Sequence, residues 1–222
     1  MKKISVAFLA VVLAFSYTSC STNETDLETS QEPLLKKAQL KRDANGAYSV
    51  RYDVSDNTVS DTRNDVNSLT KEFHLSKVGY DTKDQYREDL SLKDNTLRIG
   101  FIDNETGKST RFIIEDENFT FAKGNSTEFL KTYDWTLNSD NTVQLDFEVN
   151  DNVVAEFVYN EDLAIYEVHL SKGTSADKVF SRIINIPDNG VLKIDFVNHK
   201  LLGKGLEEQV ERHPRGIIIS DS

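Results

Sequence analysis

Cysteine is nearly absent from this chain, in which Cys20 is the one cysteine among 222 residues. An intrachain disulfide is excluded, so the fold has to be stabilised by the burial of apolar side chains. Basic residues are also scarce: 26 Lys and Arg stand against 37 Asp and Glu, which gives a formal net charge of −11. Nucleic acid and anionic lipid surfaces repel such a chain, and we expect neither as a partner.

The sequence motifs of common enzyme classes are missing as well. The chain contains no Gly-x-Ser-x-Gly elbow, no His-Glu-x-x-His helix and no Gly-rich phosphate loop. Aspartate and glutamate are so frequent that no pair stands out as the catalytic carboxylates of a glycoside hydrolase. The sequence therefore leans away from an enzyme, and it predicts neither a metal site nor a cofactor.

Long apolar runs are limited to residues 4–15, where only Ser5 interrupts them. This run is about twelve residues long, whereas a membrane-spanning helix needs about 20. Lys2 and Lys3 precede the run, and small residues follow it up to Cys20. A basic start, an apolar run and a small-residue end are typical of a secretory signal.

The residues around Cys20 resemble the cleavage site of bacterial lipoproteins, with Tyr17 in place of the usual aliphatic residue. The acidic residues that follow, between residues 24 and 28, resemble the export signal of Bacteroidota-type outer-membrane lipoproteins. This resemblance implies that residues 1–19 are a signal peptide and that Cys20 carries the lipid that attaches the protein to the outer membrane. It also implies display toward the cell exterior, with the periplasmic face as the alternative.

The next segment, residues 20–46, is polar and acidic and predicts a flexible tether. Within it, Leu34, Leu35, Ala38 and Leu40 lie among basic residues and could form a helical turn or two. Residues 47–222 are long enough for one good hydrophobic core, so we expect a single domain there.

From Tyr48 onward, apolar and polar residues alternate with a period of two, which is typical of strands with one buried face. Short turns rich in Asp, Asn and Gly separate the runs, so neighbouring strands should be antiparallel. Alternation in the second half predicts one shared core: Tyr133, Trp135, Leu137, Val143, Leu145, Phe147, Leu192, Ile194 and Phe196. Their neighbours, including Asp146 and Asp195, should face solvent.

The predicted fold is all-β, an antiparallel meander of about ten strands. Twist and exposed edges oppose a single flat sheet, so we expect either an up-and-down barrel of lipocalin-like topology or a two-sheet sandwich. Leu206 and Val210 lie four residues apart, which predicts one short helix over residues 206–212 that Pro214 ends. Residues 217–219 should form a last short strand.

Two groups of residues are candidate sites. Glu167 and His169 lie two apart on one strand and should form an exposed surface pair, which lacks the third ligand that a metal needs. Arg212, His213 and Arg215 form the one basic cluster of the domain. This cluster would either bind an anion or balance nearby acidic residues.

Three functions remain open from the sequence. The first is a surface-displayed binding or accessory protein whose ligand is a glycan, a lipid or a protein. The second is a small carbohydrate-active hydrolase with carboxylates on distant strands. The third is a structural or inhibitory surface protein. Function resides in the site, so the fold class alone does not decide among them.

Overall fold

The structure is a computed structural model that describes residues 32–116, 129–201 and 208–221. The side chains of Lys200, Leu201, Glu208, Gln209 and His213 are outside this description. Cys20 and the predicted signal peptide also lie outside the described residues. Glu32–Ser222 forms one compact unit by its internal contacts.

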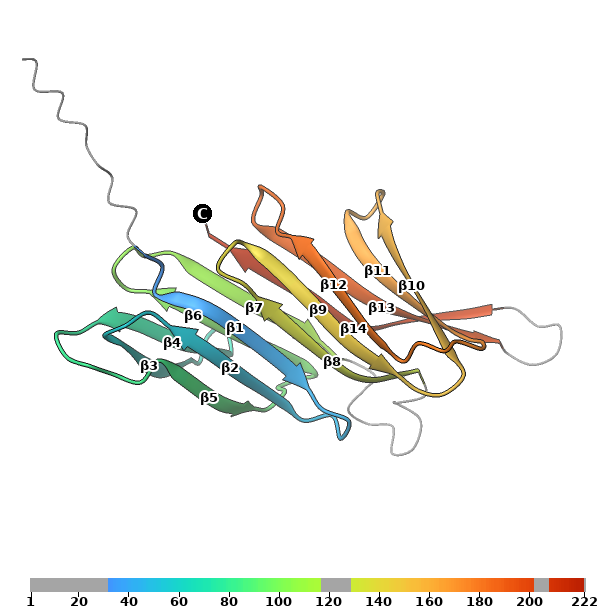
Figure 1. Cartoon of the computed structure of the whole chain (residues 1–222), viewed down its shortest axis with the longest axis horizontal. Helices are drawn as coiled ribbons and strands as arrows, with labels where there is room; N and C mark the ends of the chain where they lie inside the picture. Colours follow the sequence, from blue (N-terminus) through green and yellow to red (C-terminus); the bar gives the residue numbers. More distant parts are fainter. Residues whose placement is uncertain (1–31, 117–128, 202–207, 222) are drawn as a thin grey trace, which may run out of the picture. The chain divides into compact units, whose positions relative to one another are not determined.

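The described chain consists of two β-sheets that share a core (Figure 1). The six-stranded sheet contains, in spatial order, β12 (Val179–Asn185), β9 (Thr142–Val149), β8 (Leu130–Leu137), β1 (Leu35–Arg42), β2 (Tyr48–Val54) and β5 (Gln85–Leu90). The eight-stranded sheet contains β10 (Val153–Asn160), β11 (Ile165–Lys172), β13 (Val191–Leu201), β14 (Glu208–Ser220), β7 (Ser109–Glu115), β6 (Thr96–Asp103), β4 (Thr70–Lys77) and β3 (Thr58–Asp65).

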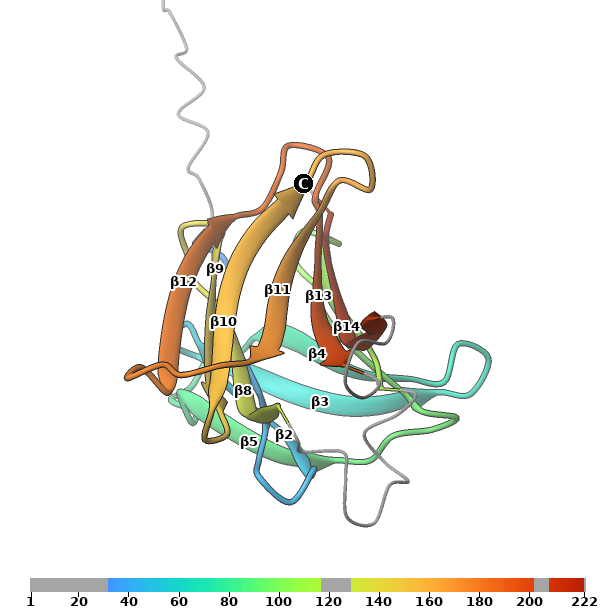
Figure 2. The ribbon, with the colours of Figure 1, turned by 90° about the vertical axis from the view of Figure 1, so that its right-hand side faces the viewer.

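The predicted all-β class is confirmed, and the two sheets are consistent with a sandwich. They do not close into a barrel, because over the described residues β12 and β5 border one sheet and β10 and β3 border the other (Figure 2). The predicted simple meander is wrong. β4 pairs with β6, and β11 with β13, in parallel, and the strand between them in sequence lies in the opposite sheet. A strand of the second sheet thus takes the place of a crossover helix.

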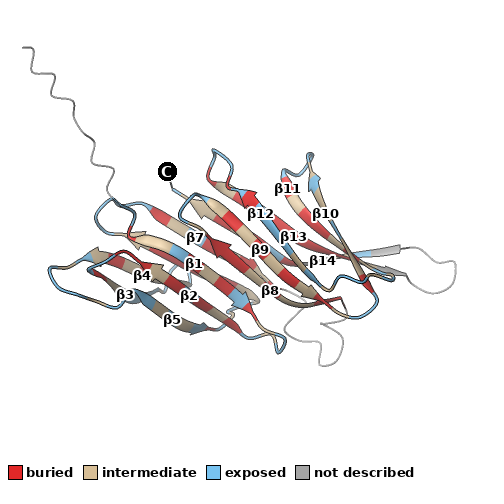
Figure 3. Cartoon of the chain, in the orientation of Figure 1, coloured by how far each residue is buried: buried red, intermediate tan, exposed pale blue. Residues whose placement is uncertain are grey.

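The core follows the predicted alternation. All nine residues predicted to share it are buried, and Trp135 and Leu145 have no exposed surface. Figure 3 shows buried residues along the strands of both sheets. The ring of Trp135 packs against Gly216 of β14, where an added Cβ would lie 2.3 Å from the ring. This approach explains the glycine, because any side chain there would collide with the largest core residue. Asp195 is an exception to the predicted pattern: it faces away from the core and is nevertheless fully buried.

The tether prediction is wrong for residues 35–42, which form β1 in the middle of the six-stranded sheet between β2 and β8. Ala38, Leu40 and Arg42 are buried, and Lys37 and Lys41 on the opposite face are exposed. This alternation has the period of a strand, and its basic residues obscured it.

The predicted helix over residues 206–212 is wrong where the structure describes it, because β14 begins at Glu208. β14 pairs with β13 on one side and β7 on the other, and these ladders outweigh a local helix of two turns. Pro214 lies at an irregularity in the β13–β14 pairing, where no ladder hydrogen bond is lost. The described ranges contain no helix long and apolar enough to cross a membrane.

Each strand of the first half has a counterpart in the second half. In the six-stranded sheet β1, β2 and β5 correspond to β8, β9 and β12. In the other sheet β3, β4, β6 and β7 correspond to β10, β11, β13 and β14. The halves join where β1 pairs with β8 and where β7 pairs with β14, at the middle of each sheet. The strand order is therefore the same read from either border, which is the pattern of an internal duplication.

The amino-acid sequence carries the same duplication, with counterparts 95 residues apart in β1 to β4 and in β6. Residues 72–77 read Glu-Phe-His-Leu-Ser-Lys and residues 167–172 read Glu-Val-His-Leu-Ser-Lys. Positive φ angles recur at the same spacing, at Asn57 and Asn152 and again at Leu69 and Ala164. Turns and strands that match at this spacing over most of the repeat indicate that a unit of about this length was duplicated in tandem.

We predict that a chain beginning at Ala44 fails to fold, whereas one beginning at Glu32 folds. The shorter chain lacks β1, which leaves β2 and β8 each without one of its two neighbouring strands and removes buried Leu34, Ala38 and Leu40 from the core. Far-ultraviolet circular dichroism and denaturant titration of both chains test this. A cooperative transition of the shorter chain at the same midpoint would show that β1 is dispensable.

Candidate functional site

Four of the five site residues predicted from the sequence lie in one network on the outer face of the eight-stranded sheet. β11 supplies Glu167 and His169, and β14 supplies Arg212 and Arg215. β13 runs between these strands and contributes Asp195. The sequence does not reveal this proximity, because it depends on a parallel pairing between β11 and β13.

Both arginines of the network form ion pairs with carboxylates. The Nη1 of Arg212 donates to Oε1 of Glu167 and lies 3.4 Å from Oδ2 of Asp195. Arg215 makes a two-pronged contact with Asp195, with Nε 3.1 Å from Oδ1 and Nη2 3.4 Å from Oδ2. Glu115 adds a third carboxylate, 3.9 Å from Arg215. Three carboxylates around two guanidinium groups favour the charge-balancing interpretation of the basic cluster over anion binding.

The prediction of an exposed Glu167–His169 pair is wrong for Glu167, which is only 3% exposed. Burial raises the pKa of Glu167, but the hydrogen bonds from Arg212 and His169 and the charge of Arg212 lower it by a larger amount. The pKa of Glu167 therefore lies below its ordinary value. The same contact with Glu167 raises the pKa of Arg212. Both groups therefore remain charged at neutral pH.

A chain of hydrogen bonds continues from Glu167 to two imidazoles. Nε2 of His169 lies 2.9 Å from Oε2 of Glu167, and Nδ1 of His169 lies 2.6 Å from Nε2 of His199. A carboxylate only accepts, so Nε2 of His169 carries a hydrogen. In the neutral ring Nδ1 is then the acceptor, and His199 donates to it.

The described part of this network is not arranged as a metal site. Among the described residues, no group of three or more His, Cys, Asp or Glu side chains is arranged to hold a metal ion. The backbone of His213 lies in β14, and its side chain is outside the described residues. A related arrangement occurs in the first half, where His74 lies 3.0 Å from Glu72 and 3.3 Å from Asn104, the counterpart of His199. We therefore assign the Glu–His pairs to the stability of this face.

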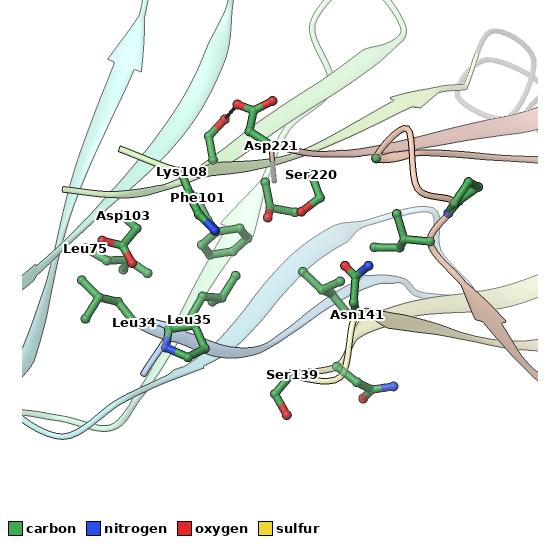
Figure 4. A pocket seen from close by; sticks show the side chains of 18 of the residues that line it. Leu34, Leu35, Leu75, Phe101, Asp103, Lys108, Ser139, Asn141, Ser220 and Asp221 are labelled. Carbon is green, nitrogen blue, oxygen red and sulfur yellow. Dashed lines mark hydrogen bonds between the residues drawn. The ribbon is translucent and has the colours of Figure 1, made fainter. Parts of the chain in front are cut away.

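A cleft at one end of the two sheets is the better candidate for a binding site (Figure 4). Its volume is about 490 Å³, within the range of small-ligand sites. Apolar side chains of both sheets form part of its lining, among them Leu34, Leu75, Phe101, Leu137 and Ile186. These five side chains are almost completely buried, so they offer an apolar base that lies below the polar groups of the turns.

Polar groups from four turns and strand ends surround this base. The carboxylates are Asp103, Asp188 and Asp221, and the one ammonium group in the lining is Lys108. The turn after β8 adds Asn138, Ser139 and Asn141. Asp221 accepts a hydrogen bond from Ser109, which ties the end of β14 to the start of β7. The excess of carboxylates disfavours an anionic ligand, and the amides and hydroxyls suit a ligand rich in hydrogen-bonding groups.

Among the described residues, larger buried side chains fill the counterpart of this cleft at the opposite end of the duplicated fold. Three pairs of equivalent positions differ between the two ends. The filled end has Tyr133, Arg42 and Tyr48, and the cleft end has Ala38, Leu137 and Val143 at the corresponding positions. The Tyr48 hydroxyl lies 2.5 Å from Oδ2 of Asp116 and 2.7 Å from the Tyr133 hydroxyl. The Nε of Arg42 lies 3.7 Å from the same Asp116 oxygen.

Burial raises the pKa of Tyr48, and the neighbouring Tyr133 and Asp116 raise it further. Burial likewise raises the pKa of Tyr133. Both hydroxyls therefore stay protonated and can donate to the carboxylate or to each other. Large hydrogen-bonded side chains thus occupy one end of the fold, and smaller apolar ones leave the cleft open at the other.

The cleft residues carry no separate signal in the sequence. Asn138, Asn141 and Asp188 lie in or next to turns and Asp103 ends β6 just before one, and turn formation explains those residue types without a ligand. The duplication was the signal that could have found them, because aligning the halves shows Leu137 opposite Arg42.

Comparisons with known proteins give no relative for this chain: no protein-family model, no curated protein and no solved structure matches it.

We predict that Glu167→Gln lowers the free energy of unfolding by about 1–3 kcal/mol at neutral pH, because it leaves the partly exposed Arg212 with one carboxylate partner fewer. The pKa of Glu167 is lowered in the folded state from 4.5, so its contribution is fully present above pH 4.5 and is lost as pH falls through the folded pKa. The difference from the wild type should therefore shrink in acid. Denaturant titrations between pH 3 and 7 measure it, with Glu161→Gln in an exposed turn as the control. A loss that is the same at every pH would contradict this assignment.

Proposed function

We propose that this protein is a lipid-anchored binding protein of the bacterial outer membrane, displayed toward the cell exterior. The order of basic, apolar and small residues before Cys20 and the acidic residues after it support the anchor. The observation that carries the binding role is the open cleft of about 490 Å³ at an end whose counterpart is filled by buried side chains.

The ligand that suits the cleft best is an uncharged saccharide. Carboxylates, amides and hydroxyls can accept or donate to sugar hydroxyls, and the apolar base can contact the carbon-bound faces of a ring. Asp103, Asp188 and Asp221 against a single Lys108 give the lining an excess of negative charge. That charge selects against sulfated or phosphorylated glycans and against anionic headgroups.

We expect uncharged oligosaccharides to shift the backbone amide NMR signals of Ser139, Asn141 and Asp188, and sulfated oligosaccharides of equal length to leave them unchanged. Ser139→Trp places a bulky ring at the mouth of the cleft and should weaken binding by about tenfold or more, the equivalent of 1.4 kcal/mol. The matched control is Ala44→Trp in the corresponding exposed turn at the filled end. Equal weakening by both variants, or tighter binding of the sulfated sugars, would refute this site.

The anchor has its own test. Cys20→Ala should abolish labelling by a fatty-acid analogue and release the protein from the membrane fraction, because no other cysteine is present to take the lipid. Protease treatment of intact cells distinguishes display to the exterior, in which the wild type is degraded, from the periplasmic face, in which it is protected. A Cys20→Ala chain that still incorporates the analogue would exclude a lipoprotein.

A further inference from the structure

The border strand β12 of the six-stranded sheet exposes apolar side chains on its outer face. Val179 is 71% exposed and Ile183 is 68% exposed, with Ser181 between them. On the inner face Phe180 stacks on Phe147, and Arg182 lies over the ring of Phe157 at 5.9 Å. A border strand whose outer row carries no charged side chain is a template for pairing with another strand.

The free edge of β12 presents the backbone groups of its odd-numbered residues. The amide of Val149 donates to the carbonyl of Lys178, and the amide of Ile186 donates to the carbonyl of Asn141. In an antiparallel ladder these even-numbered residues face β9, so the residues between them direct their N–H and C=O groups away from the sheet. Val179, Ser181 and Ile183 therefore offer both apolar side chains and backbone partners at the edge.

The corresponding border strand in the other half is built differently. In β5 the outer, edge-facing residues are Gln85, Arg87 and Asp89, which are all exposed. β3, a border of the other sheet, likewise exposes Asp61 and Arg63. Charged residues on an edge discourage strand addition. The outer row of β12 lacks this protection, although it has the same place in the duplicated fold.

The sequence of β12 is complementary to itself in one antiparallel register. When the twofold axis passes through Ser181, Val179 lies opposite Ile183 of a second copy, and Phe180 lies opposite Arg182. The first pair is apolar on both sides, and the second joins a cation to an aromatic ring. All of the edge-facing residues then meet edge-facing residues, which provides about six backbone hydrogen bonds, two for each of three pairs.

The neighbouring registers oppose like charges. A shift of the axis to Arg182 places this residue opposite its own copy, and a shift to Phe180 places Arg182 opposite Lys178. The same operation on β5 about Arg87 would place two arginines against each other. One register of one border strand is therefore favoured over its alternatives.

We propose that two copies of this chain associate by antiparallel pairing of β12 about Ser181, which joins their six-stranded sheets into one continuous sheet. The formal net charge of −11 on each copy opposes this association, so the dimer should be favoured by higher ionic strength. The interaction does not depend on the ligand or on the anchor.

A disulfide at the axis tests the proposal in the full chain. Directly opposed residues of a hydrogen-bonded pair have Cα atoms about 5.5 Å apart, which is within the range that a disulfide spans. In a Cys20→Ala background, which leaves no other thiol, Ser181→Cys should form a covalent dimer on mild oxidation. Arg87→Cys, at the equivalent position of β5, should give a yield of covalent dimer that is lower by about tenfold or more. Equal yields from the two variants, or a Ser181→Cys disulfide with a different protein, would overturn the proposal.

Charge pairs test the register. Val179→Lys with Ile183→Lys places like charges opposite each other twice across the axis, and Val179→Lys with Ile183→Glu places opposite charges there. Both positions are exposed, so each double variant should fold. We expect the lysine–lysine variant to lower the dimer fraction, measured by sedimentation velocity in 0.15 M salt, by about tenfold or more relative to the lysine–glutamate variant. Equal dimer fractions in the two variants would exclude this register, and a monomeric wild type would exclude the interface.

Discussion

The pairing of β1 with β8 is the contact on which the rest of the structure depends. It joins the two halves at the middle of the six-stranded sheet, as β7 with β14 does in the other sheet. Each half supplies three strands to one sheet and four to the other, so neither half has a closed core by itself. The shared core, from Leu40 and Val50 in the first half to Leu145 and Phe196 in the second, exists because these two seams hold the halves in register.

The two ends of the fold carry different side chains at equivalent positions of the duplication. Burial of Arg42 beside Asp116 carries a desolvation cost, and the hydrogen bonds among Asp116, Tyr48 and Tyr133 offset part of it. Leu137, the smaller residue at the equivalent position of the cleft end, carries no charge and so has no desolvation cost. It leaves space above the apolar base of the cleft. Packing alone does not require this difference, since either half could carry either set. The asymmetry is therefore the strongest indication in the structure of where a ligand would bind.

Sequence patterns predicted the second half of the fold better than its beginning or end. In β9 and in the first part of β13, apolar residues alternate with charged ones, so only one face can be buried and the predicted core is confirmed. In β1 the buried row includes Arg42, and in β14 the local spacing of Leu206 and Val210 suggested a helix. Each strand also pairs with a partner far away in sequence, β8 for β1 and β7 for β14, and local residue patterns do not reveal these pairings. The sandwich, the parallel pairs and the meeting of Glu167 with Arg212 depend on the same long-range order.

The duplication was the one long-range feature that the sequence could have revealed, since Glu-x-His-Leu-Ser-Lys occurs twice at a spacing of 95 residues. The duplication distinguishes positions that are alike in both halves from positions that differ. Leu75 and its counterpart Leu170 are both buried, so packing accounts for them. The paired Glu and His residues recur in both halves with the same hydrogen bond. The cleft, by contrast, occurs at only one of the two ends to which both halves contribute, and the apolar outer row of β12 occurs in the second half only. After a duplication, structural requirements hold the common positions alike, whereas a site needs to arise only once. The residues at which the two halves differ are therefore where binding should be sought, at Leu137 in the cleft and at Ser181 on the edge.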